Sequence, residues 1–191
     1  MSCNVDEYKE IIQTHYPEYL ILGNDQYPTN ATGIAFCKES WKDMKNKTMS
    51  GYHMLNALGI NIEKAEEKYP KNASDLFRFM LENRLVFWNA SKIDDLKSLG
   101  LPKKSIKSII CGPEAEKCLR DSEFLELCKD FPFYVPRHPC PQGANKNNSQ
   151  DIWNIFWGKK SELVKQLTSI YTNANDLINI VTDINSTLEK L

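Results

Sequence analysis

Residues 19–28 read YLILGNDQYP, an apolar run of strand length that ends in a glycine and a polar loop. Residues 133–142 have the same form and read FYVPRHPCPQ, and residues 84–89 read RLVFWN. In an open α/β sheet, ligands bind where loops follow the carboxyl ends of the strands. The pattern therefore predicts a site at that edge, with Asp25 and His138 as a candidate catalytic pair and Asn89 beside them.

Strand-like and helix-like segments alternate along the chain, which favours a mainly parallel sheet with helices on both faces. We expect four strands, at residues 19–22, 84–88, 108–111 and 133–135. The expected fold class is therefore α/β, a single domain with three layers in the order α/β/α.

Helices are expected between these strands, each with local signals at its ends. Ser74 and Asp75 are good N-cap residues for a helix that runs through Glu82. The other expected helices cover residues 6–14, 50–59 and 114–130, the last as one or two helices. Apolar residues repeat with helical period through residues 163–188, which predicts a C-terminal helical tail docked on the body.

The composition is that of one globular domain. The 191 residues are 41% hydrophobic and 26% charged, so the chain can bury one core and is not of the disordered class. We expect one domain over residues 1–191, with the tail at 161–191. The polar start of the sequence has no signal-peptide pattern, and no apolar run has membrane length. These features predict an intracellular protein, cytoplasmic if prokaryotic, with no membrane partner.

Cysteine spacing and net charge bear on cofactors and partners. Six cysteines occur without a C-x-x-C pair, which argues against a zinc or iron–sulfur centre, so we expect no metal and no cofactor. The formal net charge is −1, so nucleic-acid binding would depend on local basic patches. The candidates are lysine groups that could equally be ordinary solvated surface: Lys42, Lys45 and Lys47; Lys103, Lys104 and Lys107; Lys159 and Lys160.

Four motifs in order resemble the uracil-DNA glycosylase superfamily. They are Gly-Asn-Asp-Gln-Tyr at 23–27, Gly-Ile-Ala-Phe at 33–36, the strand that ends in Asn89, and His-Pro-Cys-Pro at 138–141. The family writes its first motif G-Q-D-P-Y and its last H-P-S-P-L, and the resemblance covers about residues 15–160. It implies a uracil-DNA glycosylase-like fold for this part of the chain, as a divergent member of the uracil-selective branch.

The resemblance implies a chemical role for two residues. Cleavage of an N-glycosidic bond builds positive charge on the sugar and negative charge on the departing base. Asp25 matches the aspartate that activates water and stabilises the sugar cation, although alone it would be a turn or N-cap residue. His138 matches the histidine that donates a hydrogen bond to the leaving uracil oxygen, a role that suits a neutral imidazole.

The resemblance also implies a set of substrate-binding residues. Asn89 matches the asparagine whose amide contacts the edge of the flipped base, and Phe36 matches the aromatic ring on which the base stacks. Without the motifs, Asn89 would be a strand-terminal turn residue and Phe36 a core residue. Tyr27 matches the tyrosine that excludes the methyl group of thymine. Asn24, beside Asp25, is expected to line the same pocket.

The sequence departs from the family pattern in both catalytic loops. Gln26 and Pro28 replace the usual Pro and His after the aspartate, and Cys140 replaces Ser in the last motif. Gln142 stands where the family has a leucine wedge that fills the hole left by the flipped base. We expect Pro139, Pro141 and Gln142 to contact DNA, with weaker penetration of duplex than in the family.

The resulting hypothesis is a metal-independent DNA glycosylase of base excision repair that removes uracil from single- or double-stranded DNA. Such an enzyme is expected to act as a monomer. The alternative is a catalytically weak or inactive glycosylase-like protein that binds nucleic acid or a nucleobase without cutting it. A scaffold that keeps only the fold is also compatible with the sequence, because fold alone does not determine function.

Overall fold

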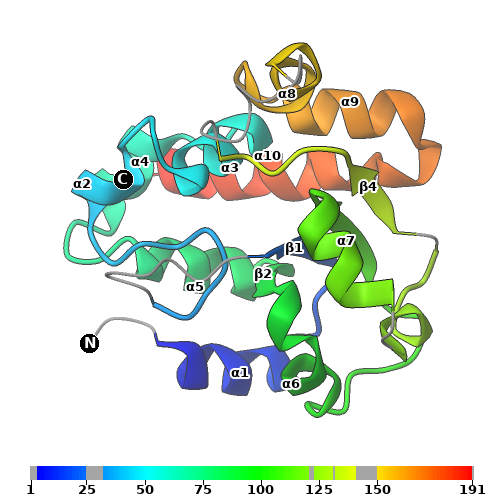
Figure 1. Cartoon of the computed structure of the whole chain (residues 1–191). Coiled ribbons are helices and arrows are strands. Elements are labelled where there is room, and N and C mark those ends of the chain that lie inside the picture. Colours follow the sequence, from blue (N-terminus) through cyan, green and yellow to red (C-terminus); the bar gives the residue numbers. More distant parts are fainter. Residues whose placement is uncertain (1–3, 25–31, 121–122, 131, 141–149, 191) are drawn as a thin grey trace.

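A computed structural model describes residues 4–24, 32–120, 123–130, 132–140 and 150–190. These residues form an α/β domain around a four-stranded, all-parallel sheet that is flanked by helices (Figure 1). The strands are β1 (Tyr19–Gly23), β2 (Leu85–Asn89), β3 (Lys107–Cys111) and β4 (Phe133–Val135), in the order β2-β1-β3-β4. The predicted α/β class and the four predicted strands are confirmed.

The helices surround the sheet, and in Figure 1 α1 and α6 lie on one side of the strands while α8, α9 and α10 lie on the other. The α-helices are α1 (Val5–Thr14), α2 (Trp41–Met44), α3 (Ser50–Leu58), α4 (Ile62–Lys68), α5 (Ser74–Glu82), α6 (Ile93–Lys97), α7 (Pro113–Arg120), α8 (Gln150–Trp157), α9 (Glu162–Ile170) and α10 (Asp176–Glu189). Short 3₁₀ helices are η1 (Ala90–Lys92), η2 (Glu123–Glu126) and η4 (Thr172–Ala174). In the part of the chain that the structure describes, no helix is long and apolar enough to cross a membrane.

Helices cover both faces of the sheet, which is why its strands consist mainly of apolar residues. Every residue of β1, β2 and β3 is buried, as expected for a parallel sheet packed between helices. The outer strand β4 exposes Tyr134, which is 36% exposed. At the other edge, the Tyr8 hydroxyl of α1 accepts a hydrogen bond from the Phe87 backbone N–H at 3.1 Å. This contact satisfies a donor of β2 that has no neighbouring strand on that side.

Two expectations about the helices are corrected. The N-cap of α5 is Ala73, not Ser74 or Asp75. Ser74 is the first helical residue, and its buried Oγ has no hydrogen-bond partner among the residues that the structure describes. The helical tail is also interrupted: α9 ends at Ile170, and η4 separates it from α10. The break lets α10 begin at Asp176, which pairs with Lys107 at the start of β3.

The Lys107–Asp176 contact fastens α10 to the amino end of the sheet. Lys107 is 8% exposed, and its Nζ also donates to the Asn173 carbonyl at 2.8 Å. The Tyr19 hydroxyl donates to the other Asp176 oxygen. Lys107 is therefore a buried structural residue, and the expectation that it belongs to a surface basic patch is wrong.

Candidate functional site

The strand order creates a crevice at the carboxyl edge of the sheet. The chain leaves β1 toward β2 on one side and later returns to β3 on the other side, so the direction of strand addition reverses between β1 and β3. Ligands in open α/β folds bind outside the carboxyl ends of the strands at such a reversal. A functional site is therefore expected where β1 and β3 end.

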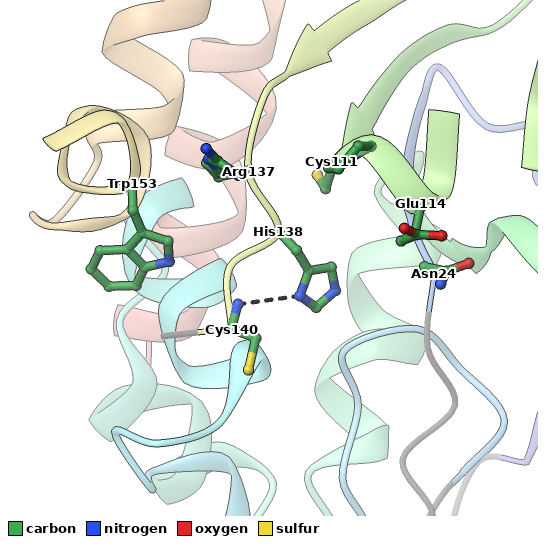
Figure 2. Close-up of a pocket in the computed structure, with 9 residues that line it drawn as sticks. Asn24, Cys111, Glu114, Arg137, His138, Cys140 and Trp153 are labelled. Carbon is green, nitrogen blue, oxygen red and sulfur yellow. Dashed lines mark hydrogen bonds between the residues drawn. The ribbon is translucent and has the colours of Figure 1, made fainter. Parts of the chain in front are cut away.

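A pocket of about 280 Å³ lies at this place (Figure 2). Its lining comes from the segments that follow β1, β3 and β4, together with α8: Asn24, Cys111, Gly112, Pro113, Glu114, Arg137, His138, Cys140 and Trp153. The volume lies near the lower end of the range for small-molecule pockets, roughly 300–1,000 Å³. Two of the predicted site residues, Asn24 and His138, thus line one pocket although they are far apart in the sequence.

The His138 imidazole is held by its own loop. The Cys140 backbone N–H donates to His138 Nδ1 at 3.2 Å, shown as the dashed line in Figure 2. A nitrogen that accepts a hydrogen bond carries no proton, so this contact selects the neutral tautomer with its proton on Nε2. The loop therefore prepares His138 as a neutral hydrogen-bond donor.

Gly112 is the residue that lets the His138 loop approach β3. It has φ +92°, and a Cβ at this position would lie 2.9 Å from the His138 backbone nitrogen and 3.1 Å from its Cβ. A side chain would therefore be strained by the backbone conformation and would also collide with the histidine segment. Together with Pro113, Gly112 forms the turn from β3 into α7.

Replacement of Gly112 by alanine is expected to destabilise the fold by about 1–3 kcal/mol and to displace His138. Gly100→Ala is the matched control, because Gly100 also has positive φ (+73°) but a Cβ there would meet no atom within 4 Å. Urea unfolding of both variants measures the cost of the backbone conformation, and ligand or substrate assays measure the displacement. Equal effects of the two substitutions would contradict a specific role of Gly112 in placing His138.

The buried ring of Phe36 lies against His138. The two ring centroids are 5.6 Å apart, with an angle of 32° between the planes. The Phe36 ring also packs over Gly23, where a Cβ would lie 2.4 Å from Cζ of the ring. Phe36 itself has φ 62°, an unfavourable conformation for a residue with a side chain. Gly23 leaves room for the Phe36 ring, which packs against His138.

Asn89 is connected to the same segment from the end of β2. Its Nδ2 donates to the Gly33 carbonyl at 3.0 Å, which fixes the orientation of the amide. Its Oδ1 is buried and has no hydrogen-bond partner among the described residues. A buried acceptor without a donor is unfavourable by about 1–3 kcal/mol, so this oxygen would gain a hydrogen bond from any ligand N–H group that reached it.

The structure thus brings Phe36 into contact with His138 and ties Asn89 to Gly33, three residues before Phe36, and only His138 of Phe36, His138 and Asn89 lines the pocket. Phe36 and Asn89 are each 2% exposed. A base could reach them only if the groups that cover them move. Pro139, a predicted DNA contact, is buried. The predicted residues Asp25, Tyr27, Pro141 and Gln142 lie outside the described residues.

Several pocket residues were not singled out in the sequence. Glu114 is an exposed carboxylate on α7, and in Figure 2 it lies with Asn24 on one side of His138. Arg137 and Trp153 lie on the other side. Glu114 follows the end of β3, so the rule that placed Asp25 and His138 at strand ends could have found it. Trp153 belongs to α8, which no strand-end argument reaches.

Cys111 also lines the pocket, at the end of β3. Burial raises the pKa of its thiol, so Cys111 is protonated at neutral pH and is not a nucleophile. Asn24 Oδ1 accepts a hydrogen bond from the Cys118 thiol of α7 at 3.4 Å. Among the described residues no group of three or more His, Cys, Asp or Glu side chains could hold a metal ion.

The predicted basic patches are partly neutralised by ion pairs. Lys45 Nζ lies 2.6 Å from Glu66, and Lys103 Nζ lies 2.5 Å from Glu126. Both pairs are on the surface, far from a desolvated environment, and contribute little to stability. Arg137, in contrast, lines the pocket directly.

Comparison of the chain with protein-family models, with curated proteins and with solved structures finds no match.

Proposed function

We propose that the protein is a DNA glycosylase that hydrolyses the N-glycosidic bond of uracil, with a three-layer glycosylase-like fold. The observation that carries this proposal is the neutral His138 imidazole, set by the Cys140 N–H, in a pocket at the strand-order reversal. A neutral donor at this position suits a leaving group that develops negative charge on oxygen, because such a donor stabilises the charge as it forms.

The motif resemblance supplies the remaining roles. Asp25 would activate the water and stabilise the positive sugar, and it directly follows Asn24, which lines the pocket. The unpartnered Asn89 Oδ1 would accept the N3–H of uracil, and Phe36 would support the base beneath His138. Because Asn89 and Phe36 are both buried, the base would reach them only with movement of the covering groups. Tyr27 would exclude thymine by steric contact with its methyl group.

The proposed reaction needs only a water molecule and the flipped nucleotide. The bond between the sugar C1′ and uracil N1 breaks, and its electron pair goes to the base, where the His138 Nε2–H donates to the developing oxyanion. Water, deprotonated by Asp25, adds to C1′. The protein residues therefore stabilise the charges at both ends of the breaking bond.

The test is incubation of the protein with an oligonucleotide that contains one uracil, followed by alkali, in single-stranded and duplex form. We expect strand breaks at the uracil and none in a matched thymine oligonucleotide. Faster cleavage of the single strand is expected, because Gln142 is a poor wedge for an opened duplex. Retention of the uracil strand without breaks would favour the non-catalytic binding protein instead. If the uracil strand is neither cleaved nor retained, both the glycosylase and the non-catalytic binding protein are overturned.

A further inference from the structure

Trp153 differs from the other three tryptophans of the chain in the hydrogen bonding of its indole N–H group. The indole N–H groups of the other three each donate to a backbone carbonyl: Trp41 to Tyr69 at 2.7 Å, Trp88 to Lys92 at 2.7 Å and Trp157 to Arg137 at 2.9 Å. Trp153 is 6% exposed, and its buried Nε1 has no hydrogen-bond partner in the part of the chain that the structure describes. Buried indole N–H groups normally find an acceptor, so an unpaired one in the lining of a pocket points to a ligand.

Arg137 shows the same property in the same pocket. Its Nε is buried and finds no acceptor in the described ranges of the chain. The other described arginine side chains are paired: Arg78 with Glu7 and Glu82, and Arg84 with Glu18. No carboxylate among the described residues pairs with Arg137. Arg137 therefore brings a positive charge to the pocket that the described residues do not neutralise.

The backbone of Arg137 is fixed from the side of α8. The Trp157 indole N–H donates to its carbonyl, and Trp153 is one helical turn earlier on the same helix. The Trp153 ring is held in turn by His53, with ring centroids 4.8 Å apart in an edge contact. Arg137 and Trp153 thus line the same pocket from two supported elements, and both lie on the side of His138 opposite Glu114 (Figure 2).

From this arrangement we propose that Arg137 and Trp153 bind a phosphate group, namely a backbone phosphodiester of the strand whose base enters the site. The planar guanidinium suits phosphate oxygens, and the indole N–H adds a neutral donor. Glu114 lies across His138 from these donors, so an anion is favoured at the Arg137 end of the pocket and disfavoured at the other. The proposal rests on the proposed function in taking a nucleic-acid strand as the source of the phosphate.

The buried positions of the two nitrogens impose a condition on binding. Both Arg137 Nε and Trp153 Nε1 are covered in this conformation, whereas Arg137 as a whole is partly exposed. A phosphate therefore meets the exposed part of the guanidinium first and reaches the two covered N–H groups when neighbouring side chains move. This local site also explains how a chain of net charge −1 could bind a polyanion.

The test measures binding of a labelled single strand that contains no uracil, by fluorescence anisotropy at several salt concentrations. Because no cleavage is involved, the result is independent of whether the protein excises uracil. We expect Arg137→Gln to weaken binding by about 10- to 100-fold and to reduce the magnitude of the salt slope by about 0.7, the value for one lost phosphate contact on a single strand. Arg84→Gln, which removes a surface arginine, is the matched control and should change neither quantity.

Trp153→Phe separates a binding role from a structural one. We expect about 3- to 10-fold weaker strand binding, because the indole N–H is lost and an aromatic ring remains against His53. Trp88→Phe loses the same ring volume and also the hydrogen bond to Lys92, so it should lower the thermal midpoint more than Trp153→Phe and leave strand binding unchanged. If Arg137→Gln does not fold, Arg137→Lys, which keeps the charge and loses the planar fork, takes its place.

Inorganic phosphate distinguishes the two sources of a phosphate group. The proposal is supported if inorganic phosphate competes with the strand for the wild-type protein, and if the Arg137 and Trp153 variants bind both the strand and phosphate more weakly. If the variants weaken only the binding of inorganic phosphate, the ligand is a free phosphate and the assignment to a strand is overturned. Unchanged affinity and salt slope in both variants would overturn the site itself.

Discussion

Asp25→Asn is expected to reduce uracil excision by about 10²- to 10⁴-fold, the usual effect of removing a general base, while strand binding stays near that of the wild type. Asparagine keeps the shape of aspartate but neither accepts the proton of the attacking water nor carries the charge that stabilises the sugar cation. Single-turnover cleavage with enzyme in excess measures the chemical step, and anisotropy on the same oligonucleotide measures binding.

Glu114→Gln is the matched control for that experiment. Glu114 is a carboxylate that lines the pocket, exposed and beside Asn24 in Figure 2. We expect its replacement to change cleavage by less than about 10-fold. If Glu114→Gln abolishes cleavage and Asp25→Asn does not, the water is activated from α7, and the role that the motif assigns to Asp25 is wrong.

The sheet was predictable from sequence because its strands are short apolar runs that end in glycine, asparagine or proline. Phe133–Val135 was predicted with the observed bounds, and the other strands within one residue at each end. Helix starts were less predictable. At α5, capping chemistry favoured Ser74 as the N-cap, but the N-cap is Ala73, which makes no side-chain cap hydrogen bond, and Ser74 is the first helical residue.

For the site, the sequence predicted the strand ends correctly, but it did not predict how deeply each side chain is buried. Asn24 and His138 line the pocket, whereas Phe36 and Asn89 are buried behind it. Nothing in the local sequence of Phe36 indicates that Gly23 makes room for its ring. Trp153 was missed for a related reason: three of the four tryptophans donate to backbone carbonyls, and only the tertiary structure shows which one does not.

The Lys107–Asp176 pair shows how a charge in a strand can be structural. Lysine at the start of a buried strand looks unfavourable, because a buried charge without a partner costs several kcal/mol. Here Asp176, Asn173 and Tyr19 all contact it or its partner. Burial disfavours the Asp176 carboxylate, but hydrogen bonds from Lys107 and Tyr19 outweigh this effect and lower the pKa of Asp176 below its usual value.

Asp176→Asn is therefore expected to lower the free energy of unfolding by about 1–3 kcal/mol at neutral pH. The full loss for a broken buried pair is about 3–5 kcal/mol, and it is reduced here because the Asp176 side chain is 36% exposed. Asp94→Asn is the control, since Asp94 pairs with Lys97 on the surface with an 86% exposed side chain, and it should cost less than about 0.5 kcal/mol.

The pH dependence of this loss tests its electrostatic origin. A carboxyl whose pKa is lowered by folding stabilises the native state fully above its unfolded pKa, near 3.8, and this stabilisation disappears as the pH falls through the lower folded value. The difference in unfolding free energy between wild type and Asp176→Asn should thus be constant from about pH 5 to 7 and shrink below about pH 4. Urea unfolding across this range measures it. A difference that persists undiminished to the acid limit would mean that shape and hydrogen bonding, not the charge of Asp176, hold α10 on the sheet.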